Sequence, residues 1–239
     1  MNREELLKAG AASIGIELTE KQTAQFIQYY EILVEWNSFM NLTGITEYEE
    51  VIQKHFVDSL ALCKAVDLHN ISNVIDIGTG AGFPGIPLKI AFPHLKITLL
   101  DSLQKRIKFL NEVVTQLGLE EVETIHGRAE DFAKPSMKRE SYDLCVSRAV
   151  ANLASLSEYC LPYVKLDGYF VPYKSGKVDE ELEASKKAVF LLGGKIEEEV
   201  KFMLPDSDIS RSLIKIKKVS ATPKKYPRKS GLATKEPIK

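Results

Sequence analysis

A glycine-rich stretch that follows an acidic residue is the part of this chain best suited to hold a small ligand. It reads VIDIGTGAGFPG over residues 74–85, and Asp76 lies inside its apolar first part. The glycines are Gly78, Gly80, Gly82 and Gly85. Glycine adopts positive φ without strain and lets the backbone approach a ligand closely. We therefore expect a buried strand that ends in a tight, ligand-binding turn and leads into a helix.

The spacing of these glycines, together with the acid before them, distinguishes between cofactors. A dinucleotide-binding turn carries G-x-G-x-x-G, and a P-loop continues into G-K-[S/T]. Here Phe83 stands where the third glycine of the first motif would be, and no G-K-[S/T] follows the glycines. A carboxylate at Asp76 would repel a pyrophosphate but attract the ammonium group of a methionine moiety, directly or through water. The stretch therefore favours S-adenosylmethionine over NAD and excludes a P-loop site.

Further candidate ligand-binding residues follow the other apolar runs of this region. They are Asp101 after 96–100, Ala129 and Glu130 after 123–126, and Arg148 after 142–147. In an open parallel sheet the ligand lies beyond the carboxyl ends of the strands, so we expect these residues to surround the glycine turn. A carboxylate at Asp101 can accept hydrogen bonds from both hydroxyls of a ribose.

The elements that must position these residues alternate between strands and helices. Strands are expected at 74–77, 96–100, 123–126, 142–147, 168–173, 195–203 and 212–219, with helices at 86–92, 104–117, 152–163 and 178–192. Short connections between them favour a parallel sheet that is covered by helices on both faces. The last two strands have no helix between them and can pair as antiparallel neighbours. We therefore predict an α/β fold with a mostly parallel seven-stranded sheet and an antiparallel last strand.

Pattern and charge divide the chain into three parts. Residues 1–70 form a helical extension, residues 71–220 the cofactor-binding domain, and residues 221–239 an irregular basic tail. The net charge is only −1, but the stretch from Arg211 to the end carries ten basic residues and one acid. This asymmetry indicates a polyanionic partner for the tail, with a merely solvated tail as the alternative.

Two helices of the extension begin with capping-box patterns. Thr19-x-x-Gln22 opens the first, and Thr46-x-x-Glu49 opens a helix that runs to about residue 65. On the second helix, His55 and Asp58 are three residues apart and therefore share one face. An ordinary surface contact between these two side chains is the alternative to a functional pair.

Composition narrows the class of protein. Hydrophobic residues make up 44% and charged residues 27%, as in globular domains, and no apolar run is long enough for a membrane span. The charged N-terminus lacks the apolar core of a signal peptide. Three widely spaced cysteines argue against a disulfide framework, and no spacing of metal ligands is found. We therefore expect a cytoplasmic protein that contains no metal and is monomeric.

The motifs resemble those of one enzyme family. The segment DIGTGAG is similar to motif I of the class I methyltransferases. The wider pattern of DIGTGAGFPGIPL, LLDSLQKRIKFL, GRAED and SRAVA resembles the bacterial small-subunit rRNA guanine-N7 methyltransferases, also called glucose-inhibited division protein B. The resemblance extends to NLT at 41–43, KHFVDSL at 54–60 and YPRKSG at 226–231. It covers nearly the whole chain and implies a Rossmann-like class I methyltransferase fold.

The resemblance also implies roles for individual residues in cofactor binding. The implied cofactor-binding residues are Asp76, Gly78, Gly80, Gly82, Phe83, Asp101, Ala129, Glu130 and Arg148. Gly78 and Phe83 would contact the cofactor through the turn, and Asp101 would bind the ribose hydroxyls. Ala129 and Glu130 would bind the adenine, whose edge would be read by backbone groups.

For the acceptor, the resemblance implies 16S rRNA, either free or in the small ribosomal subunit. Arg148 would lie where the methyl donor meets the acceptor base, and it is the candidate catalytic residue. The basic tail and the polar face of the 46–65 helix are the expected RNA contacts. The RNA-contacting residues would be Asn41, His55, Asp58, Arg228 and Lys229.

The implied reaction is methyl transfer from S-adenosylmethionine to N7 of a guanine, which leaves S-adenosylhomocysteine. The family's target is the guanine at position 527 in standard numbering, in the 530 loop of 16S rRNA. Because N7 has a lone pair and no proton in the neutral base, no general base is needed. Arg148 is better suited to read guanine O6 or a phosphate than to stabilise the positive charge that develops. Alternatives are methylation of another RNA, a small molecule or a protein, and nucleotide or RNA binding without catalysis.

Overall fold

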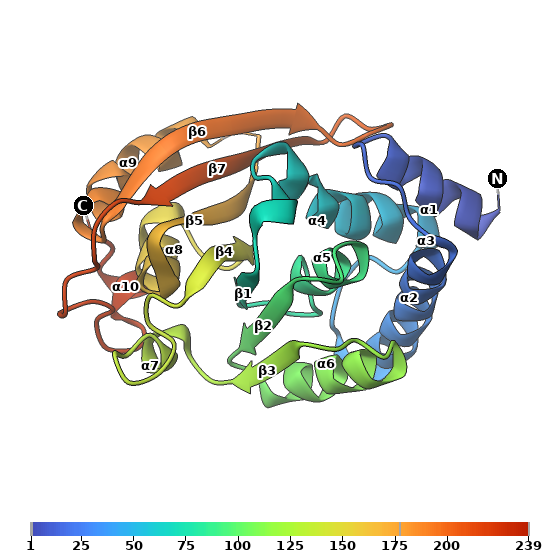
Figure 1. Ribbon diagram of the computed structural model, residues 1–239, viewed down its shortest axis with the longest axis horizontal. Helices are drawn as coiled ribbons and strands as arrows, with labels where there is room; N and C mark the ends of the chain where they lie inside the picture. The colour runs from blue at the N-terminus through green and yellow to red at the C-terminus, as the bar shows by residue number, and fades with distance from the viewer. Residues whose placement is uncertain (1, 177, 239) are drawn as a thin grey trace.

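A seven-stranded sheet forms the centre of the computed structural model, which describes residues 2–176 and 178–238. The strands are β1 Asn73–Ile77, β2 Lys96–Asp101, β3 Val122–His126, β4 Tyr142–Arg148, β5 Val164–Ser175, β6 Gly194–Met203 and β7 Ser210–Lys218. Their order is β3-β2-β1-β4-β5-β7-β6 (Figure 1). Strands β1 to β5 pair in parallel, and β7 is antiparallel to both β5 and β6. The predicted sheet, with its antiparallel last strand, is confirmed.

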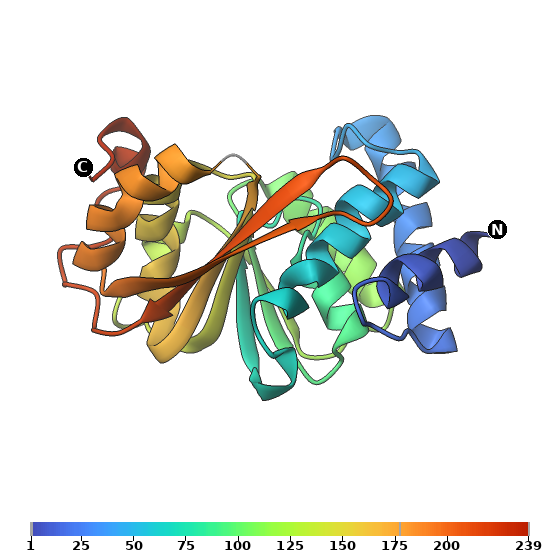
Figure 2. The same cartoon turned by 90° about the horizontal axis from the view of Figure 1, so that it is seen from above.

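The central strands are buried on both faces. Helices α5 Gly85–Ala91 and α6 Gln104–Gln116 lie on one face, and α8 Leu153–Cys160 and α9 Asp179–Leu191 lie on the other. In β1, Val74 packs into the core on the side of α5, whereas Ile75 packs into the core on the side of α8. Such double burial produces the uninterrupted apolar sequence of a parallel strand. Figure 2 shows the two helical layers on opposite sides of the sheet.

The N-terminal extension adds a second layer of helices outside α5 and α6. It contains α1 Arg3–Ala12, α2 Glu20–Met40 and α3 Tyr48–Val51. The capping box that opens α2 is confirmed: the Thr19 hydroxyl accepts a hydrogen bond from the Gln22 N–H, and the Gln22 side chain accepts one from the Thr19 N–H. None of the helices in the described part of the chain is long and apolar enough to cross a membrane.

The helix that carries His55 departs from regular α geometry. It begins with α3, passes through a π-helical turn at Ile52–Val57, and continues through α4 Asp58–Leu60 into a 3₁₀ turn at Ala61–Lys64. The expected capping box at its start is wrong, because Glu47 is the cap residue and makes no side-chain hydrogen bond to the helix. π-Helical turns are rare and occur frequently at functional sites. This turn includes His55 and is followed directly by Asp58.

The C-terminal segment, residues 221–238, folds back onto the sheet domain. Tyr226 is buried in the core on the side of α8, and Ala233 is also buried. The segment contains one helical turn, α10 Leu232–Lys235, which packs against α8 beside α7 Ala129–Phe132 (Figure 1). The segment is otherwise irregular, as predicted, but it is docked over much of its length.

Candidate functional site

The glycine turn borders a cavity of about 300 Å³. Gly78 lies in the cavity wall with φ of 69°, and a Cβ at this position would lie 2.5 Å from a methyl carbon of Val150. Gly80 also has a positive φ, but the space around its Cα is open. A Cβ on Gly82 would lie 2.8 Å from the Tyr29 hydroxyl, which belongs to α2. Gly78 therefore shapes the cavity, whereas Gly82 allows the N-terminal layer to pack against the turn.

Asp76 supports the turn from within the sheet. Its side chain is fully buried, and Oδ2 accepts hydrogen bonds from the Thr79 hydroxyl at 2.7 Å and from the Gly85 N–H at 2.9 Å. Burial raises the pKa of Asp76 to about 7, although these two hydrogen bonds oppose the shift. Among the described residues, Oδ1 has no hydrogen-bond partner. Asp76 does not itself line the cavity, and its contact with the ammonium group of a cofactor stays a prediction.

The cavity at the turn lies beyond the carboxyl ends of β1, β2 and β3. It is lined by Ile77, Gly78, Leu100, Ser102, Gly127, Arg128, Ala129, Glu130, Val150, Ala151, Asn152, Tyr159 and Thr234. This is the position at which open α/β sheets bind their ligands. The volume falls within the range of small-molecule sites. We call this space the smaller cavity.

Asp101 and Glu130 lie near the smaller cavity, but their carboxylates already have protein partners. Oδ2 of Asp101 accepts hydrogen bonds from the Gly80 N–H at 2.9 Å and from the Arg106 guanidinium at 3.1 Å. Oε1 of Glu130 accepts a hydrogen bond from the Gly231 N–H at 2.9 Å. Asp101 therefore holds the glycine turn in place, and Glu130 holds the C-terminal segment. Direct contacts of these carboxylates with a ribose or an adenine stay a prediction.

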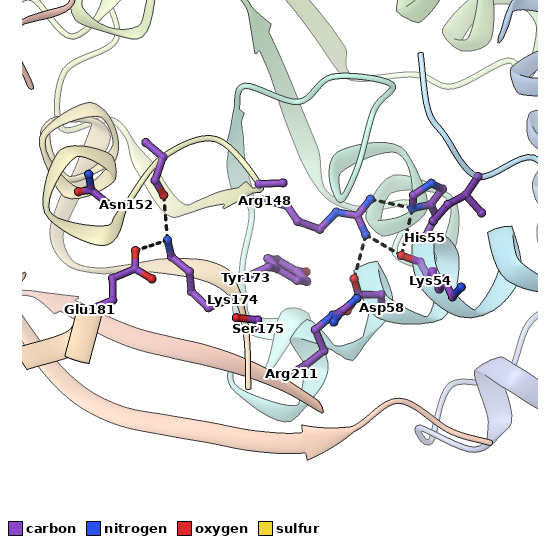
Figure 3. Close-up of a pocket in the computed structure, with 13 residues that line it drawn as sticks. Lys54, His55, Asp58, Arg148, Asn152, Tyr173, Lys174, Ser175, Glu181 and Arg211 are labelled. Atoms are coloured by element: carbon purple, nitrogen blue, oxygen red, sulfur yellow. Dashed lines mark hydrogen bonds and ion pairs between the residues drawn. The ribbon is translucent and has the colours of Figure 1, made fainter. Parts of the chain in front are cut away.

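Arg148 connects the end of β4 to the helix that contains the π-helical turn. Its Nη1 donates to Asp58 Oδ2 and to the Lys54 carbonyl, both at 2.9 Å, and its Nη2 lies 3.1 Å from His55 Nδ1 (Figure 3). Asp58 Oδ1 accepts a further hydrogen bond from Nε of Arg211, a residue of β7, at 3.1 Å. His55 and Asp58 thus lie together, as their spacing predicts. One buried carboxylate holds two guanidinium groups in place.

His55 is neutral in this arrangement. Burial and the positive charge of Arg148 lower the pKa of His55 to about 4. Nδ1 of His55 lies 3.1 Å from Arg148 Nη2 and 3.0 Å from the Lys54 carbonyl oxygen, and Nε2 lies 2.9 Å from the Thr43 hydroxyl oxygen, so both ring nitrogens have partners within the protein. The imidazole stacks on Phe83 with a centroid distance of 4.5 Å, and the Arg148 guanidinium lies 5.1 Å from the centre of the same ring. The Phe83 ring therefore packs against this cluster and does not line the cavity at the turn.

A larger cavity of about 630 Å³ opens beside Arg148 (Figure 3). It is lined by Ile45, Lys54, His55, Asp58, Arg148, Ala149, Ala151, Asn152, Tyr173, Lys174, Ser175, Glu181 and Arg211. Ala151 and Asn152 border both cavities, so the two spaces adjoin at the loop between β4 and α8. The excess of basic side chains suits an acceptor that is anionic or rich in hydrogen-bond acceptors. In the described ranges, no cluster of three or more side chains is suited to hold a metal ion.

Several residues of the larger cavity were missed in the sequence analysis. Tyr173 and Lys174 lie at the end of β5, where the Tyr173 hydroxyl donates to the Ser59 carbonyl at 2.6 Å and Lys174 binds Glu181 at 2.6 Å. Ligands of parallel sheets bind at the carboxyl ends of the strands, and applying this rule to the fifth strand would have identified Tyr173 and Lys174. By contrast, Arg211 and Glu181 come from β7 and α9, and no sequence signal placed them at this site.

Three residues expected to contact RNA lie outside the larger cavity. Asn41 is exposed and ends α2 in the left-handed conformation with φ of 51°. Lys229 is exposed, and its RNA contact, like that of Asn41, stays a prediction. Arg228, however, is bound to Glu158 of α8, with its Nε and Nη2 at 3.0 Å and 2.7 Å from the two carboxylate oxygens. These contacts favour a structural role for Arg228.

Several solved structures share the fold at low sequence identity. The structure described as StiE O-MT residues 961–1257 superposes with a TM-score of 0.56 at 19% identity, and the alignment covers 80% of this chain and 82% of that one. A SAM-dependent methyltransferase from Aquifex aeolicus gives 0.53 at 18% identity, with coverage of 70% and 92%. YcgJ from Bacillus subtilis gives 0.53 at 14% identity, with coverage of 70% and 100%. At these identities the likeness establishes the Rossmann-like class I methyltransferase fold alone.

Sequence comparisons identify the family of this chain, which the shared fold does not do. The family profile described as GidB, rRNA small subunit methyltransferase G, matches residues 22–214. A protein named ribosomal RNA small subunit methyltransferase G from Lachnoclostridium phytofermentans is 59% identical over 96% of this chain and 95% of its own length. A protein of the same name from Alkaliphilus metalliredigens is 51% identical over the full length of both. The chain therefore belongs to the family of ribosomal RNA small subunit methyltransferase G.

Proposed function

We propose that this protein transfers a methyl group from S-adenosylmethionine to N7 of a guanine in the 530 loop of 16S rRNA. Membership of a family named for rRNA methylation supports the reaction class. The observation that carries the proposal is the pair of adjoining cavities, one at the glycine turn and one at Arg148. Methyl transfer requires two reactants held in line and shielded from water, and two cavities that adjoin at Ala151 and Asn152 suit that task.

The smaller cavity fits the cofactor. Bound S-adenosylmethionine supplies an electrophilic methyl group on a sulfonium centre. The positive φ of Gly78 and the backbone of Ala129 give a nucleoside close access to main-chain donors and acceptors. The unpaired Oδ1 of Asp76 offers an acceptor for the ammonium group of the amino-acid part. The carboxylate of Asp101 acts on the same site by fixing the Gly80 N–H.

The larger cavity fits the acceptor base. A guanidinium has five N–H donors, and the described contacts of Arg148 use three of them. The remaining donors suit guanine O6, which lies beside N7 on the same edge of the base. Asp58 fixes Arg148 and Arg211 together, so these two cations are positioned before the RNA arrives. Arg211 is then available for the phosphates that flank the base, whereas the Lys54 ammonium group is paired with Glu50.

The protonation states of the cluster suit an acceptor that needs no base. His55 is neutral because its pKa is lowered to about 4, and its Nδ1 is bonded to Arg148. Asp58 is bonded on both carboxylate oxygens to arginines. Neither group is placed to accept a proton from a substrate. This favours N7, which attacks through a lone pair, over an amino or hydroxyl group that must lose a proton.

A methyl-transfer assay with tritiated S-adenosylmethionine tests the proposal. The acceptor is small-subunit rRNA that lacks the modification, and chain cleavage at 7-methylguanosine locates the product. We expect label in a single fragment from the 530 loop. Arg148→Ala should abolish transfer, whereas Arg3→Ala, which changes an arginine on the surface of α1, should retain it. Label on another base or on a small molecule, or normal turnover by Arg148→Ala, would overturn the proposal.

A further inference from the structure

The C-terminal segment contributes to the wall of the smaller cavity. Thr234 lines this cavity together with Tyr159 of α8, and Gly127 and Ala129 are part of the same lining. The hydroxyl oxygens of Tyr159 and Thr234 are 2.7 Å apart, so they share a hydrogen bond. A hydroxyl group both donates and accepts. The pair therefore presents an adaptable polar edge to whatever occupies the cavity.

Two hydrogen bonds attach this part of the segment to the walls of the same cavity. The Gly231 N–H donates to Glu130 Oε1 at 2.9 Å, and Glu130 itself lines the cavity. The Ser155 hydroxyl donates to the Ala233 carbonyl at 2.7 Å, and Ser155 lies one turn before Tyr159 in α8. The residues before and beside Thr234 are thus fixed by the elements that form the cavity.

An ion pair fixes the segment further upstream. The Glu158 side chain is 1% exposed and receives hydrogen bonds from the Arg228 backbone N–H at 2.7 Å, Nε at 3.0 Å and Nη2 at 2.7 Å. A buried carboxylate is stable only when it is paired in this way. Glu158 and Tyr159 are neighbours in α8, so the pair sets the position of the segment directly beside the cavity. The positive charge of Arg228 is therefore paired with a carboxylate of the same chain.

We propose that the C-terminal segment, held in place at Arg228 and Gly231, completes the outer wall of the cofactor's nucleoside pocket at Thr234, with the hydroxyls of Tyr159 and Thr234 facing the polar edge of the adenine. The proposal rests on the proposed function, because it takes the smaller cavity as the nucleoside site. Adenine presents an amino donor beside ring-nitrogen acceptors, and two linked hydroxyls can satisfy both kinds of group. The segment that the sequence predicts to bind RNA therefore governs cofactor affinity.

Titration calorimetry on the full-length protein tests this assignment with S-adenosylhomocysteine and with 5′-methylthioadenosine, which lacks the amino acid. Arg228→Ala should raise the dissociation constants of both ligands about tenfold, because both contain the nucleoside. Tyr159→Phe and Thr234→Val should each raise them about threefold. The matched control is Lys229→Ala, which removes the same charge from the adjacent exposed position. It should leave both constants within about twofold of wild type.

The outcomes are distinguishable. Unchanged affinity in Arg228→Ala and in both hydroxyl variants would overturn the assignment, as would a loss for S-adenosylhomocysteine alone. If circular dichroism shows that Arg228→Ala does not fold, Tyr159→Phe and Thr234→Val decide the matter, because neither disturbs the ion pair. Failure of the wild-type protein to bind S-adenosylhomocysteine would instead contradict the proposed function.

Discussion

The two regions that the sequence predicts to contact RNA differ in how their charges are used. In the N-terminal layer, Asp58 holds Arg148 and Arg211 at the wall of the larger cavity. In the C-terminal segment, Glu158 binds Arg228 beside the smaller cavity. Both regions combine a buried carboxylate with arginine, and both are rich in polar residues. The first leaves guanidinium donors at a cavity, whereas the second uses its arginine to dock a segment.

This difference shows that charge alone does not identify an RNA-binding surface. An arginine that a buried carboxylate holds can still bind RNA when it lines a cavity, as Arg148 and Arg211 do, whereas Arg228 lines neither cavity and attaches the segment to α8. Arg228 and Lys229 are adjacent and carry the same charge, but only Arg228 is paired with a buried acid in the described structure. If the two regions have different roles, substitutions in them should affect different properties of the protein.

The largest effect is expected on stability at the C-terminal pair. Arg228→Ala leaves the Glu158 carboxylate buried without its partner and should lower the free energy of unfolding by about 3 kcal/mol. The double variant Arg228→Ala with Glu158→Ala should be less destabilised, because no buried charge remains. Urea denaturation of the four proteins of this cycle measures both quantities. A double variant less stable than Arg228→Ala would show that packing, not the buried charge, dominates.

The next largest effect is expected on the rate of methyl transfer when Asp58 is replaced. Asp58→Ala releases Arg148 and Arg211 and should slow methyl transfer to RNA about 100-fold through misplacement of the acceptor. Its affinity for S-adenosylhomocysteine should stay within about twofold of wild type, since Asp58 does not line the smaller cavity. The matched control is Glu49→Ala, an exposed acid in the same helix, which should behave as wild type. Equal losses of turnover and cofactor affinity in Asp58→Ala would show that Asp58 also supports cofactor binding, which contradicts our inference.

A smaller effect should appear in the pH dependence of cofactor binding. The pKa of Asp76 is about 7 in the free protein, above its ordinary value of 3.8, so its stabilising contribution is lost as pH rises through 7. An ammonium partner lowers this pKa, so binding releases a proton below about pH 7. Affinity for S-adenosylhomocysteine should therefore rise up to about tenfold per pH unit towards pH 7 and then level off.

Calorimetry in two buffers of different ionisation enthalpy measures that proton release. The matched ligand is 5′-methylthioadenosine, which has no ammonium group and should show no such dependence. The same pH dependence for both ligands would place the linked proton elsewhere than at Asp76.

The smallest effect is expected at His55. Its pKa is lowered from 6.5 to about 4, so its contribution to stability is complete above pH 6.5 and is lost as pH falls towards 4. Turnover measured between pH 6 and 8 should therefore show no titration of His55. His55→Gln should slow transfer less than Asp58→Ala does, without changing the shape of the profile. An acidic limb near pH 6.5 that disappears in His55→Gln would show that the imidazole titrates during turnover.

The fold was predictable because its signals are local. The apolar run before the glycines indicates that β1 is buried on both faces, and the acid Asp101 is the last residue of its strand. The capping box at Thr19 depends only on residues three apart and was predicted correctly. At Thr46 the same pattern failed, because the chain instead turns into the helix at Glu47, which leads to the π-helical turn.

The partners of the charged residues were less predictable, because they depend on contacts between distant segments. Arg148 and Asp58 are 90 residues apart, and Arg228 and Glu158 are 70 apart. No local pattern specifies which carboxylate a guanidinium meets across such a separation. For the same reason, the stacking of the Phe83 ring on His55 of the N-terminal layer was not predicted, and the expected contact of Phe83 with the cofactor through the turn stays a prediction.

The central claim is that the C-terminal segment contributes to cofactor binding, whereas Asp58 and the two arginines that it holds position the acceptor. Side-by-side titration of Arg228→Ala and Asp58→Ala with S-adenosylhomocysteine tests it most directly. We predict that the dissociation constant rises about tenfold in the first protein and stays within about twofold of wild type in the second. Equal constants in the two variants, or a larger loss in Asp58→Ala, would contradict the claim.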